Sequence, residues 1–199
     1  MNDKLVYERE LAAQGYKYIC GVDEVGRGPL AGPVVCAAVI LPLDDIIEGV
    51  DDSKKLSEKK RRILSEKILE KAVGAAICLI EPQKIDEINI LQATRLCMKN
   101  AVERLSPAAD FVLTDGNMTL DISAPQKSIV KGDAKSYLIG AASIVAKVYR
   151  DNLMDELSAT YPEYGFENNK GYGTAAHIAA LKEYGLTPVH RRSFVKKIL

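Results

Sequence analysis

The chain has 199 residues, of which 47% are hydrophobic and 27% are charged, and its formal net charge at pH 7 is zero. This length suits one domain with a small appendage, and the composition excludes a disordered or fibrous protein. A zero net charge gives no global signature of a nucleic-acid-binding protein, although residues 53–62 and 187–199 are locally basic. Because electrostatic attraction is local at physiological salt, these stretches permit a polyanionic partner; solvated surface is the alternative for each.

The cysteines and the apolar runs indicate the cellular compartment of the protein. Four cysteines form no C-x-x-C pair, and three of them lie in apolar runs, which predicts buried free thiols in a reducing compartment. The first ten residues are too charged for a signal peptide, and the longest apolar run, residues 33–43, is too short to cross a bilayer. We therefore expect a cytoplasmic protein that does not bind membranes.

In the first half of the chain, β-branched and apolar residues predict strands over residues 17–22 and 34–41, separated by a glycine- and proline-rich turn. Ser57 is a plausible N-cap for a basic helix over residues 58–71. A third apolar strand follows over residues 73–80. Pro82 is expected to break the chain before a helix over about residues 90–105.

The second half alternates strands and helices. Residues 111–114 and 128–130 predict short strands, and a long helix is expected over about residues 135–159. A glycine-rich loop over residues 164–173, a helix over 175–184 and the basic tail follow. Three early strands and then alternating elements favour an α/β fold with a mixed sheet.

Four acids lie near the predicted strand ends, where α/β sheets gather their active sites: Asp23, Glu24, Asp115 and Asp133. Clustered carboxylates repel one another unless a cation neutralises them, and two divalent ions would also clamp the attacking and leaving oxygens of a phosphodiester. Neighbours on a regular strand point to opposite faces. Asp23 and Glu24 can therefore share a site only at a strand end, at a bulge or through the Glu24 carbonyl.

Each acid also has a purely structural interpretation. Asp115 precedes a glycine, as in many turns, Asp133 could be an N-cap of the long helix, and Asp23 with Glu24 could be a polar hairpin end. Two histidines, His177 and His190, are better explained by core packing or phosphate contact than by metal ligation.

The turn that follows the first two acids contains Gly26, Arg27 and Gly28. Exposed backbone N–H groups and a guanidinium bind phosphate or sugar oxygens. The glycine spacing also fits a dinucleotide fingerprint nominally, but a proline and a strand follow where that motif needs a helix. Acids and turn together indicate metal-assisted chemistry on a phosphate ester.

The sequence resembles the ribonuclease HII family, the bacterial type 2 ribonucleases H, in seven stretches that span almost the whole chain. They are residues 21–33 (GVDEVGRGPLAGP), 52–58 (DSKKLSE), 89–91 (NIL), 114–117 (TDGN), 130–147 (VKGDAKSYLIGAASIVAK), 161–174 (YPEYGFENNKGYGT) and 190–194 (HRRSF). The resemblance implies a ribonuclease H-like mixed five-stranded sheet flanked by helices in residues 1–160. It also implies a small C-terminal helical extension in residues 161–199 that binds substrate.

The resemblance further implies an endoribonuclease that hydrolyses the RNA strand of RNA/DNA hybrids and cuts 5′ of single ribonucleotides in duplex DNA, leaving 3′-hydroxyl and 5′-phosphate ends. The four acids would hold two Mg²⁺ or Mn²⁺ ions, residues 26–28 would sense the 2′-hydroxyl, and Tyr172 would pack on the sugar. Further candidate substrate contacts are Lys54, Lys55, Asn89, Lys147, Arg150, Arg191 and Arg192.

Two positions depart from the family pattern: Thr114 replaces an aliphatic residue, and Asn169 stands where a histidine is frequent. The chain has no long N-terminal extension, which argues against the type 3 enzymes, and we expect a monomer. Two other hypotheses stay open from the residues alone. They are a non-catalytic nucleic-acid-binding module and a Mg²⁺-dependent phosphatase of small molecules.

Overall fold

The computed structural model of the protein describes residues 3–51, 53–196 and 198. Its centre is a five-stranded mixed sheet with the strand order β3-β2-β1-β4-β5. Strands β1, β2 and β3 form an antiparallel meander, and β4 and β5 run parallel to β1. Their bounds are β1 (Ile19–Val25), β2 (Val34–Ile40), β3 (Gly74–Ile80), β4 (Phe111–Asp115) and β5 (Gln126–Ile129). The predicted α/β fold with a mixed sheet is confirmed.

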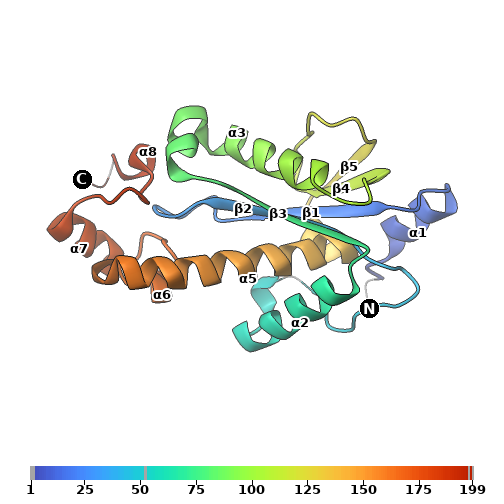
Figure 1. Cartoon of the computed structure of the whole chain (residues 1–199), viewed down its shortest axis with the longest axis horizontal. Coiled ribbons are helices and arrows are strands. Elements are labelled where there is room, and N and C mark those ends of the chain that lie inside the picture. Colours follow the sequence, from blue (N-terminus) through green and yellow to red (C-terminus); the bar gives the residue numbers. More distant parts are fainter. Residues whose placement is uncertain (1–2, 52, 197, 199) are drawn as a thin grey trace.

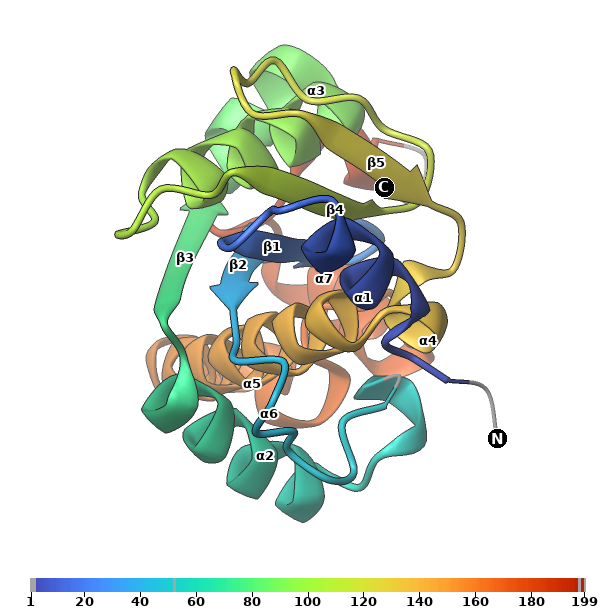
Figure 2. The ribbon, with the colours of Figure 1, turned by 90° about the vertical axis from the view of Figure 1, so that its right-hand side faces the viewer.

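Helices cover both faces of the sheet (Figures 1 and 2). Helix α3 (Pro82–Glu103) packs on one face, and α5 (Tyr137–Thr160) packs on the other with α2 (Glu58–Lys71) outside it. The remaining elements are α1 (Val6–Ala13), η1 (Ser53–Lys55), α4 (Gly132–Lys135), η2 (Pro162–Tyr164), α6 (Phe166–Asn169), α7 (Ala175–Tyr184) and α8 (Arg192–Val195). Helices α6, α7 and α8 lie at the opposite end of the molecule from α1 (Figure 1).

The interior strand β2, between β3 and β1, is buried along its whole length, so its alternating side chains build both halves of the core. Val35, Ala37 and Val39 pack on the α5 side, whereas the residues between them pack on the α3 side. All four cysteines are buried and free, as the sequence predicts, and the structure places all of them on the α3 side.

Pro82 does not break the chain as expected but begins α3, where its missing N–H costs nothing because the first amides of a helix have no partner within it. The interruption falls instead at Asn89, whose φ of 66° and ψ of 164° are not helical. The Asn89 side-chain oxygen accepts the N–H groups of Leu91 and Gln92 and so caps the second half of α3. This second half corresponds to the helix predicted from residue 90.

The long helix begins at Tyr137 because the Ser136 hydroxyl accepts the Ile139 N–H as its N-cap. Asp133 lies in the preceding short helix α4, so its interpretation as an N-cap of α5 is wrong. At the other end of α5, Met154 packs with residues of η2, α6, α7 and α8 and with Leu30. Among the described helices, none combines the length and apolarity needed to cross a membrane.

Candidate active site

Three of the four predicted acids converge at one end of the sheet. Asp23, Glu24 and Asp115 each offer a carboxylate oxygen, and these oxygens all lie within 4.8 Å of one another. The register explains the convergence of the two aspartates. Strands β1 and β4 are parallel neighbours that pair Val22 with Thr114, so the next residues in register are Asp23 and Asp115.

Glu24 joins the cluster through its side-chain carboxylate and not through its backbone carbonyl, which was one of the alternatives left open by the sequence. Strand β4 ends at Asp115, so no β4 residue lies beside Glu24, and its longer side chain bends back to the shared site. The Asp23 carboxylate accepts the Glu24 N–H at 2.8 Å, which fixes the first acid against the backbone of the second. Asp23 and Glu24 therefore meet although both lie within β1, at the place where the neighbouring strand β4 ends.

The site raises the pKa of two carboxyl groups, those of Asp23 and Glu24. Burial raises the pKa of Asp23 well above its usual range, and the negative charges of Glu24 and Asp115 raise it further. Burial also raises the pKa of Glu24, although the guanidinium of Arg27, 3.4 Å from its Oε1, opposes this effect. The Glu24 Oε2 atom is buried and has no hydrogen-bond partner. An orphaned carboxylate oxygen beside two other acids fits a divalent cation, because hard cations prefer such ligands.

Asp133 is buried but lies outside this three-acid cluster. Its Oδ2 lies 3.6 Å from the ammonium of Lys54, and its Oδ1 accepts the Ala134 N–H. The neighbouring Gly132 N–H donates to Asp115 at 2.6 Å, so the start of α4 is held against the end of β4. The structure thus places Asp133 next to the cluster through its backbone, with its carboxylate paired to a lysine.

Ser143 is a buried residue at this site that the sequence did not single out. Its hydroxyl hydrogen-bonds Asp23 and lowers the pKa of that carboxyl, and it lies 3.0 Å from the Ser53 hydroxyl. Gly21 permits this approach, because a Cβ there would lie 2.2 Å from the backbone of Leu138 at the start of α5. Its signal in the sequence is the small-residue stretch over residues 140–143, which ends in this serine and lets α5 lie close to the sheet.

Two arginines that were expected to contact phosphate instead bind backbone carbonyls of the turn after β1. That expectation is wrong, because Arg150 and Arg191 are fully buried. Arg191 donates to the carbonyls of residues 26, 27 and 32, and Arg150 donates to those of residues 31, 33 and 170. Gly26 has a φ of 90°, and a Cβ there would lie 2.2 Å from the Arg150 Nε atom. Both arginines shape the turn and are removed from solvent.

The outer side of the turn carries the remaining predicted contacts. Arg27 and Gly28 are exposed, and the ring of Tyr172 lies 3.7 Å from where a Cβ of Gly28 would stand. Tyr172 is 45% exposed. Arg27 also reaches Glu24, so the acids, the turn and the tyrosine form one continuous surface. We call this surface the acid–turn–tyrosine face.

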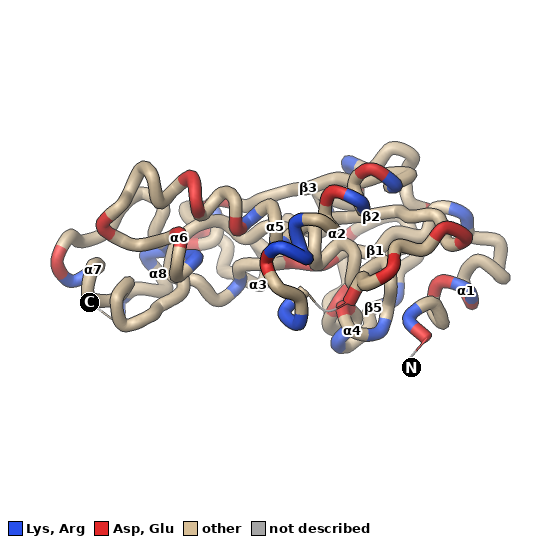
Figure 3. Tube along the Cα trace, turned by 90° about the horizontal axis from the view of Figure 1, so that it is seen from below, with Lys and Arg blue, Asp and Glu red and all other residues tan. Residues whose placement is uncertain are grey.

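The other candidate contacts differ in their accessibility. Lys54 and Lys55 are exposed, and Figure 3 shows Lys and Arg segments grouped near the adjoining helix α2. Lys147 forms an ion pair with Asp151 at 2.6 Å, and Asn89 uses its side-chain oxygen as a helix cap. Arg192 is exposed at the start of α8.

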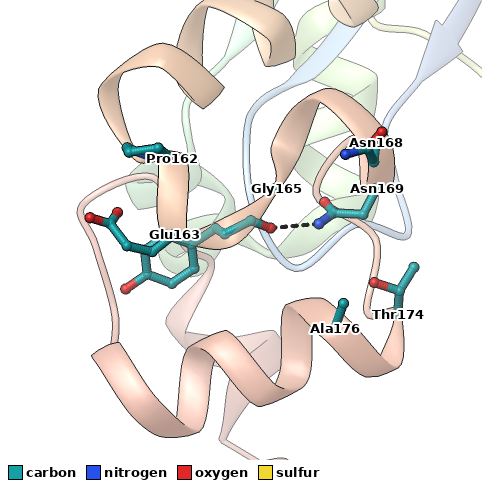
Figure 4. A pocket seen from close by; sticks show the side chains of 8 residues that line it. Pro162, Glu163, Gly165, Asn168, Asn169, Thr174 and Ala176 are labelled. Carbon is teal, nitrogen blue, oxygen red and sulfur yellow. Dashed lines mark hydrogen bonds between the residues drawn. The ribbon is translucent and has the colours of Figure 1, made fainter.

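Both departures from the family pattern are satisfied locally. The buried Thr114 hydroxyl lies 3.1 Å from that of Ser128. Asn169 donates to the Tyr164 carbonyl at 2.6 Å and accepts the Gly171 N–H at 2.8 Å. Figure 4 shows the bond from the Asn169 amide to the Tyr164 carbonyl, at the edge of a cavity of about 300 Å³ between η2, α6 and the start of α7.

A mixed sheet of this order, with acids at the adjacent ends of its first and fourth strands, defines the ribonuclease H-like class of α/β proteins. The crystal structure of the ribonuclease H2 from Pyrococcus horikoshii OT3 matches with a TM-score of 0.77 at 28% identity, covering 92% of this chain and 97% of that one. The chain belongs to the ribonuclease HII family, whose sequence model matches residues 20–197.

Curated relatives agree over nearly the whole chain. The ribonuclease HII of Acetivibrio thermocellus is 54% identical over 194 residues, which cover 98% of this chain and 76% of that protein. The ribonuclease HII of Caldicellulosiruptor saccharolyticus is 53% identical over 192 residues, which cover 96% of this chain and 94% of that protein. Family membership makes the chain a nuclease of the ribonuclease H type.

Proposed function

We propose that this chain is a metal-dependent endoribonuclease that hydrolyses the RNA strand of RNA/DNA hybrids and cuts 5′ of single ribonucleotides in duplex DNA. The products would carry 3′-hydroxyl and 5′-phosphate ends. The observation that carries the proposal is the cluster of Asp23, Glu24 and Asp115, in which a buried carboxylate oxygen has no partner. A protein that only bound nucleic acid would gain nothing from this negative charge beside phosphates.

Two divalent ions, Mn²⁺ or Mg²⁺, would supply an activated water and offset the charge that develops on the phosphate. The three clustered carboxylates would hold them, and Asp133 would join after its lysine turns away. The neighbouring negative charges that raise the pKa of Asp23 would also attract a cation, and cations compete with protons for the same oxygens. The carboxylates must therefore lose their protons before they bind cations.

The acid–turn–tyrosine face would place the substrate. The carbonyls of Gly26 and Arg27 accept from the buried Arg191, which would leave the Arg27 guanidinium and the exposed backbone at Gly28 to meet the ribose 2′-hydroxyl. Tyr172 would pack on the adjoining sugar, and Lys54 and Lys55 would contact backbone phosphates. The partners of the protein would thus be hybrids and ribonucleotide-containing duplexes.

An incision assay tests the proposal. The protein is incubated with Mn²⁺ or Mg²⁺ and a labelled DNA duplex that contains one ribonucleotide, with an all-DNA duplex as control, and the product ends are mapped. We expect one cut 5′ of the ribonucleotide and none in the control. Asp115→Asn should abolish the cut while hybrid binding persists. Absence of cutting under every metal condition would favour a binding module, and full activity of Asp115→Asn would refute the site.

A further inference from the structure

The two histidines of the chain form a buried pair in the C-terminal region. His177 lies on α7 and His190 on the segment before α8, and their Nε2 atoms are 3.1 Å apart. His177 Nδ1 lies 2.9 Å from the Tyr172 carbonyl oxygen. His190 Nδ1 lies 3.0 Å from the Thr187 backbone nitrogen. The pair thus connects the C-terminal segment with the backbone of the exposed tyrosine.

The two ends of this chain of contacts fix the position of every proton in it. A backbone N–H can only donate, so His190 Nδ1 accepts from Thr187, and the neutral ring carries its proton on Nε2. A carbonyl oxygen can only accept, so His177 carries its proton on Nδ1 and donates it to Tyr172. His177 Nε2 is then a free acceptor for the His190 Nε2–H. One pair of neutral tautomers satisfies all three contacts.

Protonation would break the chain at either ring. A second proton on His190 would displace the Thr187 N–H and leave the Thr187 hydroxyl, 2.8 Å from Nδ1, as its acceptor. A second proton on His177 would face the His190 Nε2–H. Burial lowers the pKa of His177, and burial together with the charge of His177 lowers that of His190 to about 4. The pair therefore stays neutral at pH values where an ordinary histidine begins to titrate.

Aromatic rings pack around the pair. The rings of Tyr164 and Phe166, from η2 and α6, pack on both imidazoles. Asp86 of α3 and Arg192 of α8 line the neighbouring cavity, and the Asp86 carboxylate already accepts the N–H groups of Arg192 and Ser193. These are the charged groups that face His190, and neither forms an ion pair with a ring.

The Tyr172 backbone needs such support because the residues before it are left-handed. Lys170 has a φ of 49° and Gly171 a φ of 82°. A non-glycine residue in this region costs free energy and persists only where its surroundings hold it. Arg150 binds the Lys170 carbonyl, and His177 binds the Tyr172 carbonyl, so the strained loop is anchored on both sides.

We propose that His177 and His190 are positioning residues that set the Tyr172 ring over Gly28 through this one-directional chain of hydrogen bonds. The inference rests on the proposed function, in which Tyr172 contacts the sugar beside the cut. Losing the chain should weaken productive substrate binding and leave the acids in place.

A first experiment examines the pair without any substrate. Because the chain has only two histidines, ¹⁵N-histidine labelling gives spectra of two imidazoles. We expect one ring as the Nδ1–H tautomer and one as the Nε2–H tautomer, both neutral at pH 6, with His177→Gln assigning the signals. Two Nε2–H rings, or a ring half-protonated near its ordinary pKa of about 6.5, would overturn the proposal.

Two variants of His177 then distinguish the loss of its hydrogen bond to Tyr172 from the loss of the imidazole ring itself. In His177→Asn the amide can occupy the Nδ1 position and still donate to the Tyr172 carbonyl. In His177→Gln the amide reaches the Nε2 position, so the side-chain donor is lost and the Thr174 N–H is the remaining donor to that carbonyl. We expect His177→Gln to raise KM for the ribonucleotide-containing duplex about 5- to 10-fold, the loss of one hydrogen bond, with kcat changed less than about 2-fold. His177→Asn should recover most of the loss.

A ¹³C-tyrosine spectrum makes the readout independent of activity. The Tyr172 ring signal, assigned by its loss in Tyr172→Phe, should shift in His177→Gln and stay near its native position in His177→Asn. Equal effects of the two variants, on the ring signal or on KM, would refute the positioning role. An unmodified protein that fails to cut the duplex would refute the proposed function, while the two spectra would still decide the structural claim.

Discussion

Replacing Asp115 by asparagine should stabilise the protein while abolishing its activity. At 4.8 Å, the upper limit of the distances between the clustered oxygens, and at an effective dielectric constant of about 20, two carboxylates repel by about 3 kcal/mol. Part of this repulsion is already relieved, because the pKa values of Asp23 and Glu24 are raised and protons neutralise some of the charge. Asparagine keeps an oxygen for the Gly132 N–H. We therefore expect a net gain of about 2 kcal/mol at pH 8.

The pH dependence of this gain follows from the direction of the shifts. A carboxyl group with a raised folded-state pKa destabilises the fold as pH rises from its unfolded pKa, about 4, through the raised value. The gain from Asp115→Asn should therefore be small near pH 4 and should grow as the pH rises toward 8. For a chain of this size about 2 kcal/mol corresponds to a rise in Tm of roughly 4–8 °C.

Thermal unfolding followed by circular dichroism, with a chelator present, measures this gain. Adding Mn²⁺ should raise the Tm of the native protein more than that of Asp115→Asn, because the cation replaces the missing neutralisation. Asp44→Asn, at an exposed position in the loop after β2, is the matched control and should change neither value. If Asp115→Asn were no more stable than the native protein at pH 8, the account of repulsion within the cluster would be refuted.

Other substitutions test the surroundings of the site. Lys54→Ala should lower the slope of log affinity against log salt concentration by about 1, because it removes one phosphate contact. The variant also removes the counter-charge of Asp133. An unchanged slope argues against the phosphate contact. Arg191→Met leaves three carbonyls without their donor and should cost about 3 kcal/mol or more in a urea titration. Ser143→Ala removes a hydrogen bond that lowers the pKa of Asp23, so the acidic limb of the activity profile should move to higher pH.

Much of the fold was predictable because its local signals agree with its packing. Ser57 caps a helix over residues 58–71 as predicted, and the alternation of strands and helices gave the correct class. The meeting of Asp23 and Asp115 was expected because α/β sheets gather their active sites at strand ends, and the structure adds that β1 and β4 are parallel neighbours. In each case the deciding interaction is short-range or follows from strand order.

The errors concern interactions between residues that are distant in sequence. Arg150 and Arg191 were expected at the surface because arginine is charged. Their burial depends mainly on the carbonyls of the turn after β1, which lie more than 100 residues away in the sequence. The separation of Asp133 from the other acids likewise depends on Lys54 and on the break between α4 and α5. A sequence states which groups are charged, whereas their partners depend on the completed fold.

Two parts of the candidate site are held by different structures, and this separation can be tested. The clustered acids are fixed by β1 and β4, whereas the turn and Tyr172 are held from the C-terminal segment by Arg191 and the histidine pair. Arg191→Lys, which keeps the charge but loses the planar fork, should therefore raise KM and leave the Mn²⁺-induced rise in Tm intact. The rise in Tm reports the acids alone, because cations stabilise only the fold that binds them. An equal loss of both responses would mean that the turn and the acids form one cooperative unit.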